Sequence, residues 1–310
     1  MTILSELSEQ LLLTEDELLT FSATAPRRYK KYYIPKRSST EFRLIAHPAK
    51  EVKFIQRLLV DNLKDKLPIH YSAMAYISGR GIRDNAIIHK NSNYILKMDF
   101  KNFFLSINPS VLYNILEYHG IELDSRDKNF VIGMFFWKLR RNSPLRLSIG
   151  APSSPFISNV VMYIFDDLIS NYCKSEKIQY TRYADDLTFS TKKKGSLDSI
   201  PKKVTEILKQ NYGSSLRLNS AKTVFLTKAH NRHITGITIN NNGELSLGRK
   251  RKRYLSSLVH KFSLGLVDKQ DIEKLRGYLA FAEYIEPDFI VRLNKKYGEE
   301  VLISIKSVVS

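Results

Sequence analysis

Two adjacent acids lie in what the sequence predicts to be a tight turn between two short strands. Residues Gln179 to Ser190 have the pattern of paired strands, and Asp185-Asp186 falls near their midpoint. A turn exposes neighbouring carboxylates together, whereas a helix points consecutive side chains about 100° apart. The pair therefore predicts a fold that contains an antiparallel hairpin with an acidic tip.

A third acid ends a largely apolar strand earlier in the chain. Residues Tyr94 to Phe100 predict a buried strand, in which the charged Asp99 is costly unless something pairs with it. If the strands are neighbours in one sheet, Asp99 converges with Asp185 and Asp186. Carboxylate oxygens suit Mg²⁺, and two such ions about 4 Å apart can promote attack of a sugar hydroxyl on a triphosphate. We therefore predict that the three acids are catalytic and bind two Mg²⁺ ions, with Mn²⁺ as a substitute.

A second acidic pair, Asp166-Asp167, lies in the middle of a predicted helix. Neighbouring side chains diverge on a helix, and most acidic pairs are solvated. We interpret this pair as plain helix surface.

The charge of the chain favours a polyanionic partner. Its 310 residues contain 49 Lys and Arg against 31 Asp and Glu, so the formal charge is 49 − 31 = +18. No apolar run approaches the roughly 20 residues that span a bilayer, so no membrane partner is expected. The N-terminal residues lack signal-peptide features, and a single cysteine, Cys173, excludes an internal disulfide. We expect a cytoplasmic location.

Strand-like and helix-like segments are mixed along the chain, which predicts an α+β fold. Strands are expected at 29–34 and 42–46, around a turn at 36–40, and at 215–218, 224–226 and 234–240, with a turn at 241–243. Helices are expected at 1–20, 49–67, 126–141 and 156–174, and from 249 onward. Trp137 is expected in an apolar helix and in the core.

Several motifs resemble those of reverse transcriptases. The segment Tyr180 to Ser190 resembles their active-site hairpin, Met98 to Phe104 resembles their first catalytic strand, and Gly150 to Pro155 resembles the segment before their template-contacting helix. Two signatures resemble those of bacterial retron reverse transcriptases: Asn85-Ala86-Ile87-Ile88-His89 and Ile234-Thr235-Gly236. The matches cover roughly residues 28–240 and keep the order of the family.

The resemblance implies a right-hand polymerase fold. We expect fingers at residues 1–93, a palm with an antiparallel sheet at 94–241, and a helical, RNA-binding thumb at 242–310. Helices on the fingers side, at about 125–147, are inserted in the palm.

The resemblance also implies nucleotide contacts. Phe104 falls at the position of a steric gate that selects dNTPs, and Phe103 is expected in the core. The full expected set is Arg43, Phe100, Phe104, Gly150, Ala151 and Lys222. Ile149 departs from the family, because many relatives have a glutamine there and isoleucine cannot hydrogen-bond through its side chain.

RNA contacts are expected at two places. The basic run contains Arg249, Lys250, Arg251, Lys252 and Arg253, for which a solvated helix face is the alternative. The retron signature adds Asn85 and His89, although a lone histidine can equally be structural.

The implied function is that of a retron enzyme. Such an enzyme binds its cognate structured non-coding RNA and copies part of it from dNTPs into single-stranded DNA, primed from a guanosine 2′-hydroxyl. An effector or toxin protein encoded nearby is the expected partner in antiphage defence. One alternative is a group II intron-like reverse transcriptase, although these residues include no maturase or endonuclease segment. The other is an RNA-binding scaffold or antitoxin without catalysis.

Overall fold

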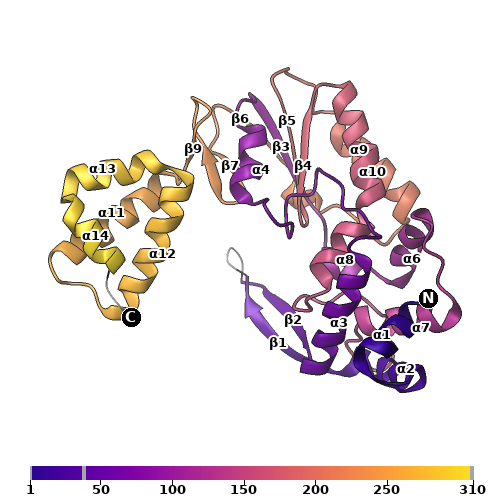
Figure 1. Cartoon of the computed structure of the whole chain (residues 1–310). Coiled ribbons are helices and arrows are strands. Elements are labelled where there is room, and N and C mark those ends of the chain that lie inside the picture. Colours follow the sequence, from indigo (N-terminus) through magenta and orange to yellow (C-terminus); the bar gives the residue numbers. More distant parts are fainter. Residues whose placement is uncertain (1, 37–39, 308–310) are drawn as a thin grey trace. The chain divides into compact units, whose positions relative to one another are not determined.

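The computed structural model describes residues 2–36 and 40–307, and within them runs of helices are interspersed with short strands (Figure 1). The helices are α1 (Ile3–Leu11), α2 (Glu15–Thr24), α3 (Lys50–Leu63), α4 (Ile82–His89), α5 (Phe103–Ser106), α6 (Pro109–Tyr118), α7 (Ser125–Phe135), α8 (Ser154–Val161), α9 (Tyr163–Ser175), α10 (Ile200–Tyr212), α11 (Arg249–Ser263), α12 (Lys269–Ile285), α13 (Pro287–Tyr297) and α14 (Glu299–Ser307). The strands are β1 (Tyr29–Pro35), β2 (Phe42–Pro48), β3 (Tyr94–Asp99), β4 (Gln179–Tyr183), β5 (Asp186–Thr191), β6 (Val224–Thr227), β7 (Arg232–Ile234), β8 (Ile237–Ile239) and β9 (Leu245–Ser246).

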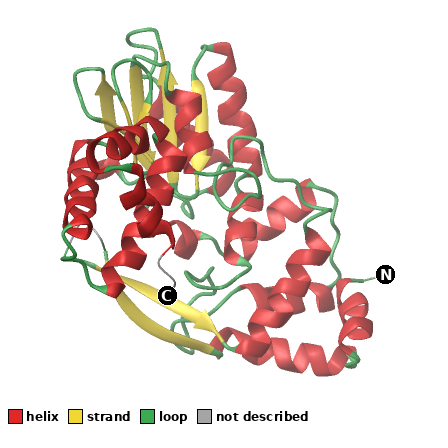
Figure 2. Cartoon of the chain, turned by 60° about the vertical axis from the view of Figure 1, so that its left-hand side comes forward, coloured by secondary structure: helices red, strands yellow, loops and turns green. Residues whose placement is uncertain are grey.

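The strands form three sheets. The largest has the order β4-β5-β3-β6, β1 pairs with β2, and β7, β8 and β9 form a third sheet. Figure 2 shows the strands of the largest sheet, in yellow, running side by side. Helix α9 packs against β4, and α10 packs against α9. The mixture of helix and sheet confirms the predicted α+β class.

The chain divides into two compact units, each described separately below. Unit 1 comprises the residues up to 78, 97–189 and 195–224, and unit 2 comprises 79–96, 190–194 and the residues from 225 onward. The fingers, palm and thumb boundaries expected from the resemblance stay a prediction.

The N-terminal helical segment of unit 1 is broken, whereas the sequence predicted one helix over 1–20. Leu12 adopts a left-handed conformation with φ 54°, which ends α1. Thr14 then starts α2 through a capping box with Glu17, as the sequence spacing indicates. Asp127, at the start of α7, accepts hydrogen bonds from the backbone N–H groups of Ile3 (3.2 Å) and Leu4 (2.8 Å) and so holds the start of α1.

The predicted hairpin is confirmed in β1 and β2. Their antiparallel register runs from Tyr29 opposite Pro48 to Pro35 opposite Phe42. Residues 37–39 of the predicted turn lie outside the described residues. At the base of the hairpin, one core cluster contains the buried residues Tyr29, Ala46, Trp137 and Ala151.

Two helices in the structure have bounds that differ from the predicted ones. Helix α7 ends at Phe135, and the chain then becomes extended, so that Trp137 pairs with Arg146. Trp137 is therefore a core residue, as expected, but not a helical one, and its indole N–H donates to the Leu147 carbonyl at 3.2 Å. The helix predicted at 156–174 is two helices that meet at Met162.

Unit 2 has a core of its own. Strands β7 and β8 are joined by Thr235 and Gly236, which both have positive φ, the pattern of a type I′ turn. The expected turn at 241–243 connects β8 to β9. Buried apolar residues of α11, α12 and α13 complete this core, among them Leu255, Val259, Leu275, Leu279, Ala282, Ile290 and Leu293.

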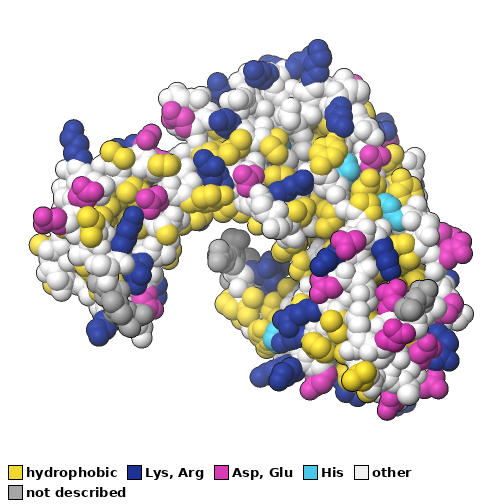
Figure 3. Space-filling view, viewed as in Figure 1, with side chains coloured by type: hydrophobic (Ala, Val, Ile, Leu, Met, Phe, Trp, Pro, Cys, Tyr) yellow, Lys and Arg dark blue, Asp and Glu magenta, His cyan; other side chains and the backbone are white. Residues whose placement is uncertain are grey.

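Charged side chains of both signs lie on the surface. Figure 3 shows Lys and Arg side chains spread over the face in view, with Asp and Glu side chains among them. Within the described part of the chain, no helix combines the length and the apolar character needed to cross a bilayer.

Candidate active site

The acidic hairpin predicted from the sequence is formed by β4 and β5. These neighbouring strands are joined by Ala184 and Asp185, and Asp186 begins β5. Ala184 has φ 55°, and positive φ at only the first of two central residues is the pattern of a type II′ turn. This conformation costs energy for a residue with a Cβ atom, so the turn depends on its surroundings to hold it.

The strand that carries Asp99 lies beside this hairpin, as the sequence predicted. Strand β3 is the neighbour of β5, and the backbone N–H of Phe100 donates to the Asp185 carbonyl at 3.1 Å. On the other side, the N–H of Asn219 donates to the Asp99 carbonyl at 2.7 Å. These main-chain bonds bring Asp99 close to the two acids of the turn, although the residues lie 86 positions or more apart in sequence (185 − 99 = 86).

The acids of the turn resist ionisation. Burial raises the pKa of Asp185, and the charge of Asp99 raises it further, against the opposing charges of Lys222 and Arg43. Burial and the charge of Asp185 raise the pKa of Asp186 to about 6. A bound cation would relieve this repulsion and favour the ionised carboxylates.

Lys222 supplies a positive charge at the site. Its ammonium donates to Asp99 Oδ2 at 2.7 Å, and 59% of the lysine side chain is exposed. Burial lowers the pKa of Lys222, but the hydrogen bond and charge of Asp99 outweigh burial, so the pKa is raised overall. Lys222, which the resemblance implies to be a nucleotide contact, therefore lies next to the acids.

The three carboxylates suit a hard divalent ion by the nature of their oxygens. Among residues 2–36 and 40–307, however, no three His, Cys, Asp or Glu side chains are grouped closely enough to form a ready-made metal site. The ammonium of Lys222 instead provides the cation next to Asp99.

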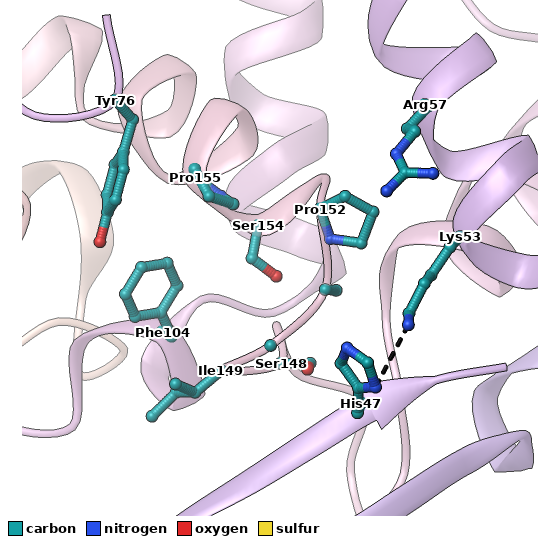
Figure 4. Close-up of a pocket in the computed structure, with 12 residues that line it drawn as sticks. His47, Lys53, Arg57, Tyr76, Phe104, Ser148, Ile149, Pro152, Ser154 and Pro155 are labelled. Carbon is teal, nitrogen blue, oxygen red and sulfur yellow. Dashed lines mark hydrogen bonds between the residues drawn. The ribbon is translucent and has the colours of Figure 1, made fainter. Parts of the chain in front are cut away.

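A cavity of about 300 Å³ in unit 1 contains several of the expected nucleotide contacts (Figure 4). Phe104, Gly150 and Ala151 line it. Figure 4 shows the Tyr76 and Phe104 rings on one side of the cavity, and His47, Lys53 and Arg57 on the other. The two aromatic rings meet edge to face with centroids 6.5 Å apart, and His47 Nδ1 lies 3.2 Å from the Lys53 ammonium.

Neighbouring phenylalanines have different surroundings. Phe103 is buried as expected, whereas Phe104 is half-buried at the cavity. The side chain of Phe100 is also buried and stacks on Phe103, with centroids 5.3 Å apart. Burial of this ring disfavours a side-chain contact between Phe100 and a nucleotide. Only the backbone of Phe100 contacts the site, through its N–H bond to the Asp185 carbonyl.

Gly150 is required by close approach of two backbones. A Cβ atom there would lie 3.1 Å from the Ala46 carbonyl oxygen, and the φ of Gly150 is +124°. The N–H of Ala46 donates to the Ile149 carbonyl at 3.0 Å, and the Ser148 hydroxyl donates to the Ala46 carbonyl. Ile149, the departure from the family pattern, is thus held by its main chain while its side chain lines the cavity.

The expected RNA contacts fall into two groups. Asn85 and His89 are fully buried, which disfavours direct contact with RNA. Burial lowers the pKa of His89 to about 3, so its ring is neutral. In the basic run, Arg251 donates to the Gly236 carbonyl at 2.9 Å and Lys252 pairs with Glu286 at 3.0 Å. The remaining members are exposed and make no ion pair or side-chain hydrogen bond with another described residue: Arg249, Lys250 and Arg253.

The interpretation of Asp166-Asp167 as helix surface is wrong for its first member. The Asp167 side chain is 45% exposed, but Asp166 is fully buried and pairs with Arg182 of β4 at 2.6 Å. The sequence contained a signal for this pair, because Arg182 shares one face of the strand with Tyr180 and a buried arginine needs an acid. The position of that acid could not be derived from spacing.

Comparisons with known proteins show the family of the chain. The family model for reverse transcriptase (RNA-dependent DNA polymerase) matches residues 34–239. The chain is 49% identical over 280 residues to the Retron Ec83 reverse transcriptase of Escherichia coli, which covers 90% of this chain and 89% of that protein. It is 31% identical over 318 residues to the Retron Ec73 reverse transcriptase of Escherichia coli, covering 97% and 96%.

A solved structure shares the fold. The telomerase from Candida albicans, in complex with a TWJ fragment of telomeric RNA, superimposes with a TM-score of 0.52 at 14% identity. The match covers 94% of this chain and 59% of that one, so this chain spans about three fifths of the telomerase. The right-hand polymerase fold is thereby confirmed. The chain belongs to the reverse transcriptases, and among them to the bacterial retron enzymes, so it is an RNA-directed DNA polymerase.

Proposed function

We propose that this enzyme binds its cognate structured non-coding RNA and copies part of it into single-stranded DNA, starting from a guanosine 2′-hydroxyl of that RNA. The product is a branched RNA–DNA molecule. The observation that carries the proposal is the main-chain link between Phe100 and Asp185, which brings Asp99 beside the acids of the turn. This arrangement has the donor set that nucleotidyl transfer requires.

Asp99, Asp185 and Asp186 would hold two Mg²⁺ ions, with Mn²⁺ as an alternative. When bound, these ions activate the attacking hydroxyl and neutralise the leaving oxygens. Asp185, which belongs to the turn, is the more direct ligand of its pair. Asp186 lies at the start of β5 and acts mainly on the local field.

The nucleotide is held by residues of unit 1. The Lys222 ammonium, now paired with Asp99, is close enough to the acids to bind the phosphates that leave. Arg43, on β2, is exposed and acts electrostatically on Asp185, as expected of a side chain that meets the incoming triphosphate. Phe104 excludes a 2′-hydroxyl at the cavity, and Gly150 and Ala151 allow the nucleotide to approach the backbone.

The exposed residues of the basic run bind the RNA. Arg249, Lys250 and Arg253 project from α11 and have no acid to neutralise them within the described residues. Phosphate contacts by such side chains release counterions and strengthen binding at low salt. Tyr254 and Tyr278, which are exposed and lie 5.9 Å apart by ring centroid, offer surfaces on which bases can stack.

The test is to express the enzyme together with the DNA that flanks its gene and to isolate small nucleic acids. We expect a species that is sensitive to both RNase and DNase. Asp185→Asn combined with Asp186→Asn should abolish it. The matched control is Asp167→Asn, which alters the half-exposed acid of the other pair, whose Oδ1 lies 3.9 Å from His70 Nε2. Persistence of the species in the double variant would contradict the catalytic assignment.

The assembly with an effector protein encoded nearby, and a role in antiphage defence, are proposed from the family alone. The cytoplasmic location likewise stays a prediction. Infection of cells that carry the whole locus tests the defence role. We expect the plaque count to rise when Asp185→Asn replaces the wild-type residue, and an unchanged plaque count would remove the defence role from the proposal.

A further inference from the structure

A fully buried ion pair lies directly behind the acidic turn. Arg182 of β4 and Asp166 of α9 have no exposed surface. Arg182 Nε donates to Asp166 Oδ1 at 2.9 Å, and Nη2 donates to Asp166 Oδ2 at 2.6 Å. The Tyr180 hydroxyl also donates to Asp166 Oδ1, at 2.7 Å. Such a pair gains little net stability after the cost of desolvating two charges, so stability alone does not explain it.

The same guanidinium also bonds the turn. Arg182 Nη1 donates to the Ala184 carbonyl at 3.2 Å. That carbonyl belongs to the peptide unit between Ala184 and Asp185, so its orientation sets the direction in which Asp185 leaves the turn. Because Ala184 has positive φ, the turn has a costly backbone conformation that an external hydrogen bond can hold.

A third residue extends the network to the cavity. Arg182 Nη1 donates to Asn159 Oδ1 at 3.0 Å, and Asn159 Nδ2 donates to the Ala75 carbonyl at 2.9 Å. Ala75 precedes Tyr76, which has φ 63° and lines the cavity beside Phe104. Asn159 is fully buried, so its two bonds are not shared with water.

We propose that Asp166 and Arg182 are positioning residues that hold Asp185 in its productive orientation, and that Asn159 couples this turn to the Tyr76 wall of the cavity. The inference rests on the proposed role of Asp185 and adds three residues to the machinery of the reaction. The planar guanidinium is suited to this task because one rigid group can serve a carboxylate, an amide and a carbonyl together. A lysine ammonium has the charge but not this geometry.

The first test replaces Arg182 with lysine and measures extension of oligo(dT) on poly(rA) with dTTP. The Arg182→Lys variant keeps a cation for Asp166 but loses the fork that reaches Ala184. We expect kcat to fall by about 10- to 100-fold, the cost of a small misplacement of a reacting group. The Mg²⁺ concentration at half-maximal rate should rise as well, because Asp185 is less well placed.

A matched control separates positioning from loss of stability. Asp127 is a buried acid of unit 1 that bonds the start of α1, outside the turn and the cavity. Asp127→Asn should lower the melting temperature while kcat and the Mg²⁺ requirement stay within about twofold of wild type. If Arg182→Lys loses no more activity than Asp127→Asn at the same loss of melting temperature, the proposal is overturned.

Two further variants keep the test decisive if Arg182→Lys does not fold. The double variant Asp166→Leu with Arg182→Met removes both charges and leaves no unpaired ion, a change that buried ion pairs often tolerate. It should fold and lose kcat as Arg182→Lys does, and wild-type kcat in this variant would refute the positioning role.

Asn159→Ala keeps the ion pair and should raise the KM for dTTP more than it lowers kcat. An unchanged KM would remove the link to Tyr76.

These outcomes are distinct from a failure of the proposed function. If Asp185→Asn retains activity on poly(rA), the catalytic assignment itself is wrong. If Asp185→Asn is inactive while the Arg182 and Asn159 variants match Asp127→Asn, only the positioning network is rejected.

Discussion

The side-chain amide of Asn85 donates a hydrogen bond to the hydroxyl of Thr235 at 3.4 Å, across 150 positions of sequence. Thr235 also donates to the Ile82 carbonyl at 3.3 Å, so the β7–β8 turn is tied to helix α4 at two points. The two signatures by which the sequence resembles retron enzymes therefore contact each other inside unit 2. Their shared role in the structure is to join α4 to the sheet of β7, β8 and β9.

This contact predicts that Asn85→Ala acts on stability. Loss of a buried hydrogen bond should lower the free energy of unfolding by about 1–2 kcal/mol. Thr235→Ser, which keeps the hydroxyl, should retain most of this stability. Chemical denaturation measures both variants. A variant Asn85→Ala with wild-type stability and weakened RNA binding would instead support the direct RNA contact that the sequence suggested.

His89 predicts a pH dependence of stability. Its folded pKa of about 3 lies below the ordinary value of 6.5, so the unfolded chain takes up a proton first as the pH falls. Stability is therefore fully present above pH 6.5 and lost progressively below it, by about 2 kcal/mol between pH 7.5 and pH 5. His89→Gln removes this contribution. The stability difference between wild type and His89→Gln should change by that amount over this range, and a constant difference would contradict the neutral, buried ring.

The basic run predicts two separable classes of variant. Replacing Arg249, Lys250 and Arg253 with glutamine should weaken binding of the RNA that copurifies with the enzyme. The slope of log K against log salt should decrease in magnitude by about 2–3, or 0.7–0.9 for each lost phosphate contact. The melting temperature should not change.

The control is the other pair of the same run. Arg251→Gln with Lys252→Gln removes the contacts to Gly236 and Glu286 and should lower the melting temperature instead. An equal change in salt slope for both sets would show that the members with contacts inside unit 2 and those without such contacts do not differ in role.

Phe104 predicts selection of the sugar. Phe104→Ala opens the cavity and should reduce the preference for dNTPs over rNTPs by about tenfold or more, measured as the ratio of kcat/KM values. Phe103→Leu changes the neighbouring ring, which is in the core, and should cost about 1 kcal/mol of stability while leaving the preference unchanged. An unchanged preference in Phe104→Ala would exclude it as the steric gate.

The local parts of the site could be predicted from the sequence. The strand that ends at Asp99 and the hairpin at Asp185 each have a short-range pattern, and the neighbouring position of their strands followed from the chemistry the acids would share. The residues at which helices end were harder to predict. The residues around Trp137 have the composition of a helix, but the main-chain pairing of Trp137 with Arg146 makes this segment extended.

The long-range polar contacts could not be predicted from patterns. Asp166 has the sequence surroundings of a surface acid, and only the fold places it behind the turn, opposite Arg182. The burial of Asn85 and His89 is likewise a property of packing, since polar residues carry no periodic signal of their own. Composition showed that the basic run was charged, but not which members are already neutralised by contacts such as that of Lys252 with Glu286.

The main-chain bond between Ala46 and Ile149 has a consequence for how this enzyme can diversify. The backbone at position 149 is anchored whatever side chain it carries, while that side chain faces the cavity. We therefore expect that exchange of Ile149 for glutamine changes the chemistry of the cavity lining without rebuilding the scaffold. Position 149 is a place where the cavity can be altered, by natural drift or by an engineer, one residue at a time.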